Sequence, residues 1–311
     1  MSTSTIGVPL TRVVVMGGTH GNEMSGVCLV KKWIKDSSEL CRETFKAEPF
    51  LANPRAVERC VRFIDQDLNR SFSMEKLSAS ECENDPYEIK RAREIYQRYG
   101  LNLSSADFIF DLHNTTSNMG TTLLYCKLDD YLALHMARYL QINCDDASLP
   151  CRIFFIDIPE KDNVYLQNIA KHSLTLELGP QPQGVTRADI LIRMKNLVNC
   201  GLDFIDVFNQ GKEFPSFETE IYRVASKMHY PRGADGEIQA FIHPKLQDND
   251  YLPLNPGDPM FKTIQGEDIF YEGEKTIYPA FINEAAYYGN NVAFVVTEKV
   301  HFTVPTLRLK H

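Results

Sequence analysis

Short apolar runs alternate with longer amphipathic stretches from residue 10 to about residue 210. The short runs are rich in β-branched and aromatic residues and predict strands, whereas the amphipathic stretches have the apolar spacing of helices. The predicted strands span residues 11–17, 48–53, 107–112, 121–126, 151–157 and 173–178. The predicted helices span residues 24–35, 86–99, 128–142, 162–171 and 186–210. This alternation predicts an α/β fold, in which helices cover the faces of a sheet.

The pattern changes after Asn209-Gln210-Gly211, where prolines and glycines interrupt short β-prone runs. Because Pro and Gly interrupt regular elements and favour turns, this part of the chain is typical of a small β-rich domain. Its predicted strands lie within residues 237–242, 277–282 and 292–304. We therefore expect a first domain of residues 1–210 and a smaller, β-rich domain of residues 211–311.

The composition is that of a globular protein, with 43% hydrophobic and 24% charged residues in a chain of 311. A net charge of -8 argues against nucleic acid as a partner, because phosphate binding needs clustered Lys and Arg. No apolar run approaches the roughly 20 residues that span a bilayer, so no transmembrane segment is expected. The eight cysteines form no CxxC pair, and we expect them to be reduced thiols. We expect a cytoplasmic protein, and peripheral contact with a membrane stays open.

Two polar motifs directly follow predicted strands. Gly17-Gly18-Thr19-His20-Gly21-Asn22-Glu23 follows the first strand, and His113-Asn114 follows the third. His20 and Glu23 lie on a glycine-bearing turn and can reach one ion, to which His113 can add a third ligand. Such a pair also recurs by chance on protein surfaces, but open α/β sheets bind ligands at the carboxyl ends of their strands. Two His and one carboxylate leave a coordination position open, which is typical of catalytic zinc and indicates a hydrolytic site.

The segment from Arg62 to Arg70 carries further candidates. Asn69 and Arg70 can bind a substrate carboxylate, which a planar guanidinium holds bidentately. Arg62 can polarise a scissile carbonyl and stabilise an oxyanion. Asp67 can accept the second N–H of a metal-bound His, and Asp65 competes for that role. The alternative interpretation is a solvated, charged loop.

Glu177 is the candidate general base. It ends the apolar run Ser173-Leu174-Thr175-Leu176 and precedes a turn rich in proline and glycine. A carboxylate is costly to bury on an apolar strand, so its pKa is expected to rise toward a useful range. It could then take a proton from the attacking water and pass it to the leaving amine. An exposed Glu on an edge strand is the alternative.

An aromatic segment near the C-terminus runs from Phe281 to Tyr288. Within it, Tyr287 could fold back and donate a hydrogen bond to a substrate carboxylate or to the reaction intermediate. A pair of tyrosines is more often explained by ordinary packing, so the segment alone does not decide between these interpretations.

Together, the motifs GGTHGNE, DxDLNR, DLHNTTSNMG, ELGPQPQG and NEAAYY closely resemble the aspartoacylase family of zinc N-acyl-amino-acid amidohydrolases. The resemblance runs over essentially the whole chain. It implies a zinc-carboxypeptidase-like mixed sheet flanked by helices, a β-rich C-terminal domain that contributes to the active-site entrance, one Zn²⁺ per chain and a homo-oligomer. It also implies roles for site residues: zinc ligands His20, Glu23 and His113, general base Glu177, carbonyl activator Arg62, carboxylate-binding Asn69 and Arg70, and substrate contact Tyr287.

The chain departs from the aspartate-specific branch of that family at one position. That branch is expected to carry an Arg that reads the side-chain carboxylate of N-acetylaspartate, and this chain has Gln167 there. No Arg occurs from Ile153 to Thr186, although Lys161 and Lys171 remain. A neutral residue would leave a second substrate carboxylate poorly paired in a desolvated pocket. The chain is thus more similar to the branch that acts on N-acetylated aromatic amino acids and mercapturic acids.

We therefore expect an enzyme whose small-molecule substrates are N-acetyl aromatic amino acids and mercapturic acids, and which releases acetate and a free amino acid. The first alternative is an aspartoacylase in which Lys161 or Lys171 replaces the absent Arg. A carboxypeptidase is a more distant alternative. A protein that binds metal and ligand without catalysis is the alternative from another class.

Overall fold

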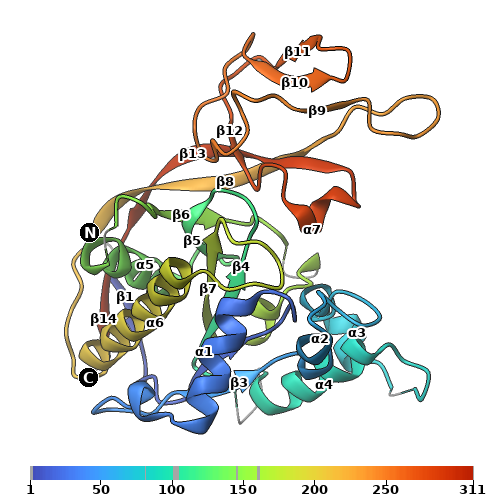
Figure 1. Cartoon of the computed structure of the whole chain (residues 1–311). Helices are drawn as coiled ribbons and strands as arrows, with labels where there is room; N and C mark the ends of the chain where they lie inside the picture. The colour runs from blue at the N-terminus through green and yellow to red at the C-terminus, as the bar shows by residue number, and fades with distance from the viewer. Residues whose placement is uncertain (1–2, 81, 101–104, 145, 160–161, 311) are drawn as a thin grey trace.

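The computed structural model describes residues 3–80, 82–100, 105–144, 146–159 and 162–310. A mixed sheet of nine strands in the order β12-β13-β8-β6-β5-β7-β4-β2-β3 runs through it, flanked by helices (Figure 1). Its strands are β2 (Val13–Gly17), β3 (Glu48–Leu51), β4 (Phe108–Asn114), β5 (Gly120–Tyr125), β6 (Cys151–Phe155), β7 (His172–Gly179), β8 (Phe217–His229), β12 (Tyr278–Ala280) and β13 (Val292–Val304).

The other elements are helices and two small sheets. The helices are α1 (Met24–Lys35), α2 (Pro54–Arg59), α3 (Met74–Ser78), α4 (Tyr87–Tyr99), α5 (Tyr131–Asn143), α6 (Ala188–Asn209) and α7 (Ala285–Tyr288), with 3₁₀ turns η1 (Ser38–Leu40), η2 (Leu68–Arg70) and η4 (Leu166–Ile169). One small sheet pairs β1 (Thr3–Ile6) with β14 (Thr306–Leu309), and the other contains β9 (Ala240–Ile242), β10 (Pro259–Thr263) and β11 (Asp268–Phe270). The predicted α/β architecture is confirmed.

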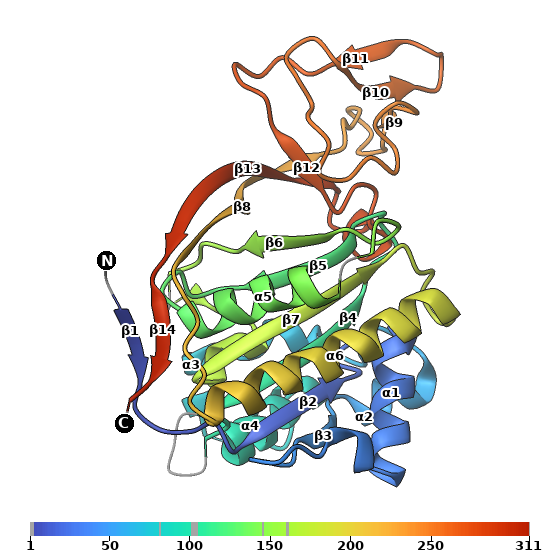
Figure 2. The same ribbon diagram turned by 90° about the vertical axis from the view of Figure 1, so that its left-hand side faces the viewer.

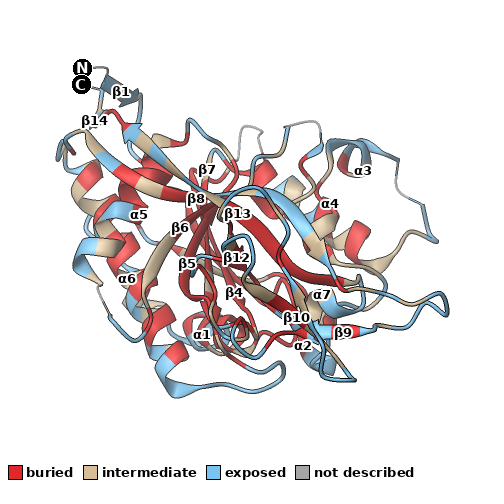
Figure 3. Cartoon of the chain, turned by 90° about the horizontal axis from the view of Figure 1, so that it is seen from above, coloured by how far each residue is buried: buried red, intermediate tan, exposed pale blue. Residues whose placement is uncertain are grey.

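The two faces of the sheet pack against different helices because side chains alternate along each strand. Phe110 of β4 packs with Trp33 of α1 and Leu197 of α6 in one core, and Figure 2 shows α5 and α6 crossing this face. Ile109 of β4 packs with Tyr99 of α4 in a second core on the other face. In Figure 3 the buried residues are concentrated along the central strands.

The long strands β8 and β13 connect the C-terminal region to the main sheet. They pair antiparallel along their length, and β8 also pairs with β6, so both are part of the nine-stranded sheet. The small sheet of β9, β10 and β11 has its own core, which includes Phe261 and Phe294 (Figure 1, top). The boundary expected near residue 210 thus falls between α6 and β8, but the main sheet continues across it.

The helix predicted over residues 162–171 is wrong. The residues described there contain the 3₁₀ turn η4 and no α-helix. In this segment, side-chain hydrogen bonds take the place of the backbone hydrogen bonds of a helix. Asn163 accepts a hydrogen bond from the Tyr165 N–H, and Asn168 donates to the carbonyls of Phe72 and Asn163. Asn side chains compete in this way with helical hydrogen bonds.

Within the described ranges, no helix is long and apolar enough to cross a membrane.

Candidate metal and substrate site

The turn after β2 presents two polar side chains at the carboxyl end of the strand. Gly18 has a φ of +73°, a backbone conformation that favours glycine. Gly21 packs so closely on α2 that an added Cβ would lie 2.1 Å from the carbonyl carbon of Ala56. The backbone N–H of Glu23 donates to the carbonyl of His20, which closes the turn. Both glycines are therefore needed for the turn that holds His20 and Glu23.

His113 reaches the same place from β4, which pairs in parallel with β2. Its Nδ1 lies 2.9 Å from Oε2 of Glu23 and 3.2 Å from Nδ1 of His20. The His20 Nδ1 lies 2.6 Å from Oε1 of Glu23. All three residues are buried, and their ligand atoms lie within 4.8 Å of one another, so this triad could bind a metal ion. The sequence placed these three residues in one cluster, and the structure brings them together.

A carboxylate lies behind each imidazole. Oδ1 of Asp67 accepts from Nε2 of His20 at 3.0 Å, and Oδ2 of Asp111 accepts from Nε2 of His113 at 2.7 Å. These contacts leave Nδ1 of each ring as the acceptor that faces the cluster. Histidine ligands in metal sites are oriented in this way, so the donor set suits a metal such as zinc.

Asp111 was not among the sequence candidates. It precedes His113 by two positions on β4 and therefore lies on the same face of the strand. Its other oxygen accepts a hydrogen bond from the Thr19 hydroxyl at 2.8 Å. The Asp-x-His spacing on a buried strand could have identified it. Asp65, the competitor of Asp67, instead accepts from the backbone N–H of Tyr87 at the start of α4.

The charges in this cluster favour a cation. Burial by itself would raise the pKa of Glu23, but His20 and His113 outweigh it and lower that pKa below its usual range. Burial would lower the pKa of His113, but Asp111 and Glu23 outweigh it and raise that pKa. Glu23 thus stays ionised and stabilises positive charge beside it.

Arg62 lies beside the triad. Its Nη1 donates to Glu23 at 3.3 Å, and its Nη2 donates to Asp67 at 3.0 Å. Burial would lower the pKa of Arg62, but Glu23, Asp67 and Tyr287 outweigh it and raise that pKa. The guanidinium is therefore a fixed positive charge at the edge of the metal cluster.

Asn69 and Arg70 lie on η2, just after Asp67. Oδ1 of Asn69 accepts from the backbone N–H of Leu166, which leaves its amide group as the remaining polar end. The guanidinium of Arg70 stacks over the ring of Tyr165 at 4.5 Å and donates to the carbonyl of Asn69. Both side chains line the same cavity as the triad.

Glu88 of α4 holds the loop that carries these residues. Its buried carboxylate accepts from three consecutive backbone N–H groups, those of Ile64, Asp65 and Gln66, at 2.7 to 3.2 Å. The side chain of Asn53 donates a fourth hydrogen bond. Nothing in the sequence near Arg62 indicated this anchor, because its partners are backbone groups.

Glu177 lies next to His113 because their strands pair in parallel and the two residues are opposite each other. It lines the cavity. Burial raises the pKa of Glu177 well above its usual value, and the charge of Glu23 adds to the rise, while His113 and Arg62 oppose it. A carboxylate with a raised pKa is a stronger proton acceptor than an ordinary Glu, as a general base requires.

Gln167 lies on η4 and is only 2% exposed. Its Nε2 donates to the hydroxyl of Thr175 on β7. Its Oε1 is buried and has no hydrogen-bond partner in the described part of the chain. Gln167 also lines the cavity, so its neutral side chain forms part of the wall of this site.

Tyr287 enters the cavity from α7, where burial raises its pKa. The helix is anchored by Glu284, whose Oε2 accepts from the backbone N–H of Thr116 at 2.7 Å and also from the hydroxyl of Thr115. Its Oε1 caps the helix by accepting from Ala286. Thr115 and Thr116 directly follow β4, so Glu284 links the C-terminal segment to the strand that carries His113.

The cavity that joins these groups has a volume of about 350 Å³. The triad and Glu177 line it. Apolar residues from both parts of the chain also line it: Leu124, Phe154, Ile156, Ile158, Val224, Phe281, Val292 and Val295.

Among the described residues, the cations that line the cavity are Arg62, Arg70 and Lys227. Lys171 does not line it, because it is 46% exposed at the start of β7 and pairs with Asp107 at 2.7 Å. Lys161 lies outside the described residues. Every other site residue predicted from the sequence, apart from Asp67 and Asp65, lines the cavity.

Known families and proteins are similar to this chain over most of its length. Residues 9–205 match the family described as succinylglutamate desuccinylase/aspartoacylase catalytic domain, and residues 217–299 match the AstE/AspA barrel-sandwich hybrid domain. The chain is 65% identical over 303 residues to an N-acyl-aromatic-L-amino acid amidohydrolase (carboxylate-forming) of Xenopus laevis, covering 97% of this chain and 99% of the relative. It is 49% identical over 290 residues to an aspartoacylase of Danio rerio, covering 92% and 91%.

Among solved structures, the crystal structure of murine aminoacylase 3 superposes with a TM-score of 0.93 at 47% identity, covering 96% of this chain and 99% of that chain. The mixed sheet, its flanking helices and the β-rich C-terminal region are therefore those of a known fold.

Proposed function

Because the chain belongs to the succinylglutamate desuccinylase/aspartoacylase family, we propose that it is a zinc amidohydrolase that deacetylates N-acetyl aromatic amino acids and mercapturic acids. One observation carries this proposal: a buried His-Glu-His triad opens with Glu177 into a largely apolar cavity, where neutral Gln167 stands in place of a second carboxylate-binding cation. The products would be acetate and a free amino acid.

His20, Glu23 and His113 would bind the zinc ion through the atoms that converge in the cluster. When bound, zinc supplies Lewis acidity, which polarises the scissile carbonyl and acidifies a water molecule. Asp67 and Asp111 hold the two imidazoles in the tautomer that presents Nδ1 to the cluster.

Glu177 would take the proton of the attacking water and deliver it to the leaving nitrogen. Its raised pKa supports both transfers, because it makes the carboxylate a stronger proton acceptor than an ordinary Glu. Arg62 would stabilise the negative charge that develops on the carbonyl oxygen, because its guanidinium is fixed beside the triad by Glu23 and Asp67.

Arg70, Asn69 and Tyr287 would bind the α-carboxylate of the substrate. The stacking of Arg70 on Tyr165 orients the guanidinium plane, which reduces the entropy lost when a carboxylate binds. The Tyr287 hydroxyl could donate to the same carboxylate, and Glu284 holds the helix that carries it.

The apolar walls of the cavity support an aromatic or thioether side chain in the substrate, since burying such a group displaces water from apolar surface. The alternative substrate is N-acetylaspartate. It is supported by the 49% identity to an aspartoacylase of Danio rerio. Among the described residues, Lys227 could bind its second carboxylate, whereas Lys171 is already paired with Asp107 outside the cavity.

We further propose that residues 1–210 supply the metal cluster and the base, and that residues 211–311 shape the entrance. This division is supported by Phe281, Tyr287 and Val295, which line the cavity from the second part. A homo-oligomer, which the family resemblance implies, is part of the same proposal and can be tested by light scattering.

The test is kcat/KM of the zinc-loaded protein for N-acetyl-tyrosine and for N-acetylaspartate, each with a chelator-treated sample beside it. Preference for N-acetyl-tyrosine that chelation abolishes would support the proposal. Preference for N-acetylaspartate that a Lys227→Gln variant loses would support an aspartoacylase. Hydrolysis of a C-terminally aromatic dipeptide would indicate a carboxypeptidase, and turnover of none of the three would indicate a binding protein.

A further inference from the structure

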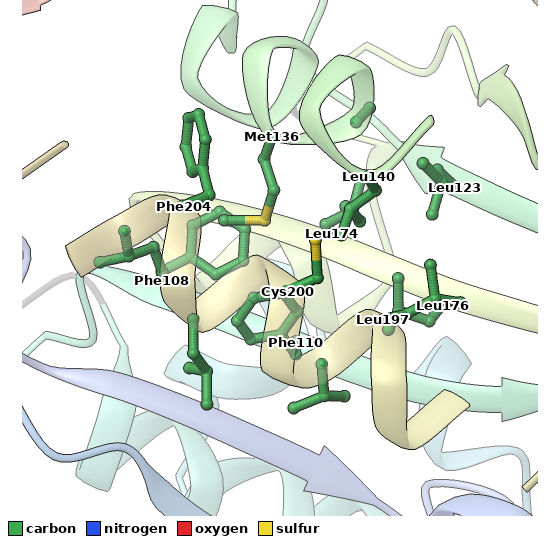
Figure 4. Close-up of a cluster of buried hydrophobic side chains, with 14 of the residues drawn as sticks. Phe108, Phe110, Leu123, Met136, Leu140, Leu174, Leu176, Leu197, Cys200 and Phe204 are labelled. Carbon is green, nitrogen blue, oxygen red and sulfur yellow. The ribbon is translucent and has the colours of Figure 1, made fainter. Parts of the chain in front are cut away.

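Two cysteines meet on the face of the sheet that is opposite the metal cluster. Cys144 is the C-cap of α5, where its backbone N–H donates to the carbonyl of Leu140. Cys200 lies in the middle of α6, is 9% exposed and packs in the core with Phe110 and Leu197 (Figure 4). Neither cysteine lines the active-site cavity.

The two thiols are close together. The Sγ of Cys144 lies 4.0 Å from the carbonyl oxygen of Asn196, which is one helical turn before Cys200 on α6. The Cys200 side chain is close enough to Cys144 to be the largest influence on the Cys144 pKa, which it lowers. Cys144 is only half-buried, so a small solute can approach the pair from the end of α5.

A buried cation with an unused donor lies beside this pair. Arg193 lies two turns before Cys200 on α6, and its Nη1 donates to the carbonyl of Cys144. Its Nε donates to the hydroxyl of Thr121 at 3.1 Å. Its Nη2 is buried and has no hydrogen-bond partner among the residues that the structure describes. An unpaired guanidinium N–H in the interior is costly, and an oxygen atom on Cys144 would be a partner for it.

We propose that Cys144 and Cys200 form a peroxide-reactive thiol pair, in which a hydroperoxide oxidises Cys144 and Cys200 resolves it to a disulfide. All eight cysteines are free in the structure, so the pair is present in its reduced form. Redox-reactive cysteines are accessible, lie near a cation and have a second thiol beside them, and this pair has all three properties.

The reaction has two steps. The Cys144 thiolate attacks the terminal oxygen of the hydroperoxide, the O–O bond breaks, and the leaving alkoxide or hydroxide takes up a proton, which leaves a sulfenic acid on Cys144. The Cys200 sulfur then attacks that sulfur, the S–O bond breaks, and the hydroxide leaves as water with the proton of Cys200. Two thiols lose two electrons in total, and one hydroperoxide is reduced to water and an alcohol, or to two waters.

The pKa values of the two thiols also indicate that Cys144 is oxidised first and that Cys200 resolves it. The Cys200 side chain lowers the pKa of Cys144 to about 7 against the effect of burial, and the charge of Arg193 adds to the fall. The Cys144 side chain and burial raise the pKa of Cys200, which therefore stays a thiol until Cys144 has reacted. Thiolate is the nucleophilic form, so Cys144 reacts first.

The experiment uses the full-length, wild-type protein under native conditions. Stoichiometric hydrogen peroxide is added at pH 7, remaining thiols are alkylated, and peptides are analysed by mass spectrometry without reduction. The expected result is a Cys144–Cys200 linked peptide that forms before any other thiol is oxidised. Without peroxide, Cys144 should be alkylated several-fold faster than the exposed Cys41, because Cys200 and Arg193 lower the pKa of Cys144.

Three variants separate the roles. Cys200→Ser should convert the product into an oxygen adduct on Cys144, because the resolving thiol is gone. Arg193→Lys should slow oxidation of Cys144 several-fold, and Cys41→Ser should change nothing. The proposal is overturned if wild-type protein yields no linked peptide, or if Cys144 is oxidised no faster than Cys41. Both results come from the wild-type chain, so they do not depend on a variant that folds.

Discussion

Substituting Arg for Gln167 tests whether this one residue determines the substrate class. The side chain is 2% exposed, donates to Thr175 and leaves its Oε1 without a partner among the described residues. A guanidinium placed there would enter the same desolvated cavity as Glu177 and Arg70. A second carboxylate on the substrate could then neutralise it, whereas an aromatic side chain could not.

The size of the effect follows from the burial. A hydrogen bond to a charged group in such a site contributes about 1.5–3 kcal/mol, so kcat/KM for N-acetylaspartate should rise by roughly 10-fold to 150-fold. Kcat/KM for N-acetyl-tyrosine should fall by a similar factor, because the buried guanidinium stays unpaired beside an aromatic ring. The ratio of the two values should therefore change by roughly 10²-fold to 10⁴-fold.

The assay measures acetate release from both substrates by Gln167→Arg and by a neutral control of similar size, Gln167→Met. Circular dichroism and zinc content show that each variant is folded and loaded. The control should not gain activity toward N-acetylaspartate, since it adds no charge. If the Arg variant is folded, binds zinc and keeps the wild-type ratio of the two substrates, residue 167 does not read the side-chain carboxylate.

Three further substitutions test other parts of the site and the core. Glu177→Gln removes the proposed base but keeps its size, so turnover should fall by roughly 10²-fold to 10⁴-fold with zinc content unchanged; near-normal turnover would remove Glu177 from the mechanism. Asp111→Asn should weaken zinc binding by roughly 10-fold to 100-fold in competition with a chromophoric chelator, and an unchanged affinity would mean that its contact with His113 is dispensable. Burial raises the pKa of Asp250 to about 7. Because this pKa is higher in the folded state than in the unfolded one, wild-type protein should lose up to about 4 kcal/mol relative to Asp250→Asn as pH rises from about 4 to about 7. If this inference is wrong, denaturant unfolding across that pH range would show the same change in the free energy of unfolding for both proteins.

Much of the fold could be predicted because its first part has strong, local patterns. The buried strand β2 is a continuous apolar run, β4 begins with one, and β7 alternates leucine with polar residues. The helices α1 and α6 have the periodicity of amphipathic helices. The three residues of the triad could be grouped because His20 and Glu23 follow β2 and His113 lies near the end of β4, and parallel strands carry ligands at their carboxyl ends.

The rest depended on contacts between distant parts of the chain. The strand β8 was not predicted, because its polar positions are exposed and its place beside β6 is set by tertiary pairing. The residues between Asn163 and Asn168 have helical spacing but use side-chain hydrogen bonds instead. Glu284 could not be assigned to Thr116, 168 positions earlier, from spacing alone.

Glu88 has a consequence for how this site can change over evolution. Its carboxylate holds the loop before Asp67 through the backbone N–H groups of Ile64, Asp65 and Gln66. Any residue except proline offers the same N–H group, so the shape of the loop does not depend on which side chains these positions carry. Substitutions there can adjust the surroundings of the active site while Arg62 and Arg70 keep their places. A fixed backbone that tolerates varied side chains would let related enzymes diverge in substrate without rebuilding the residues that perform the reaction.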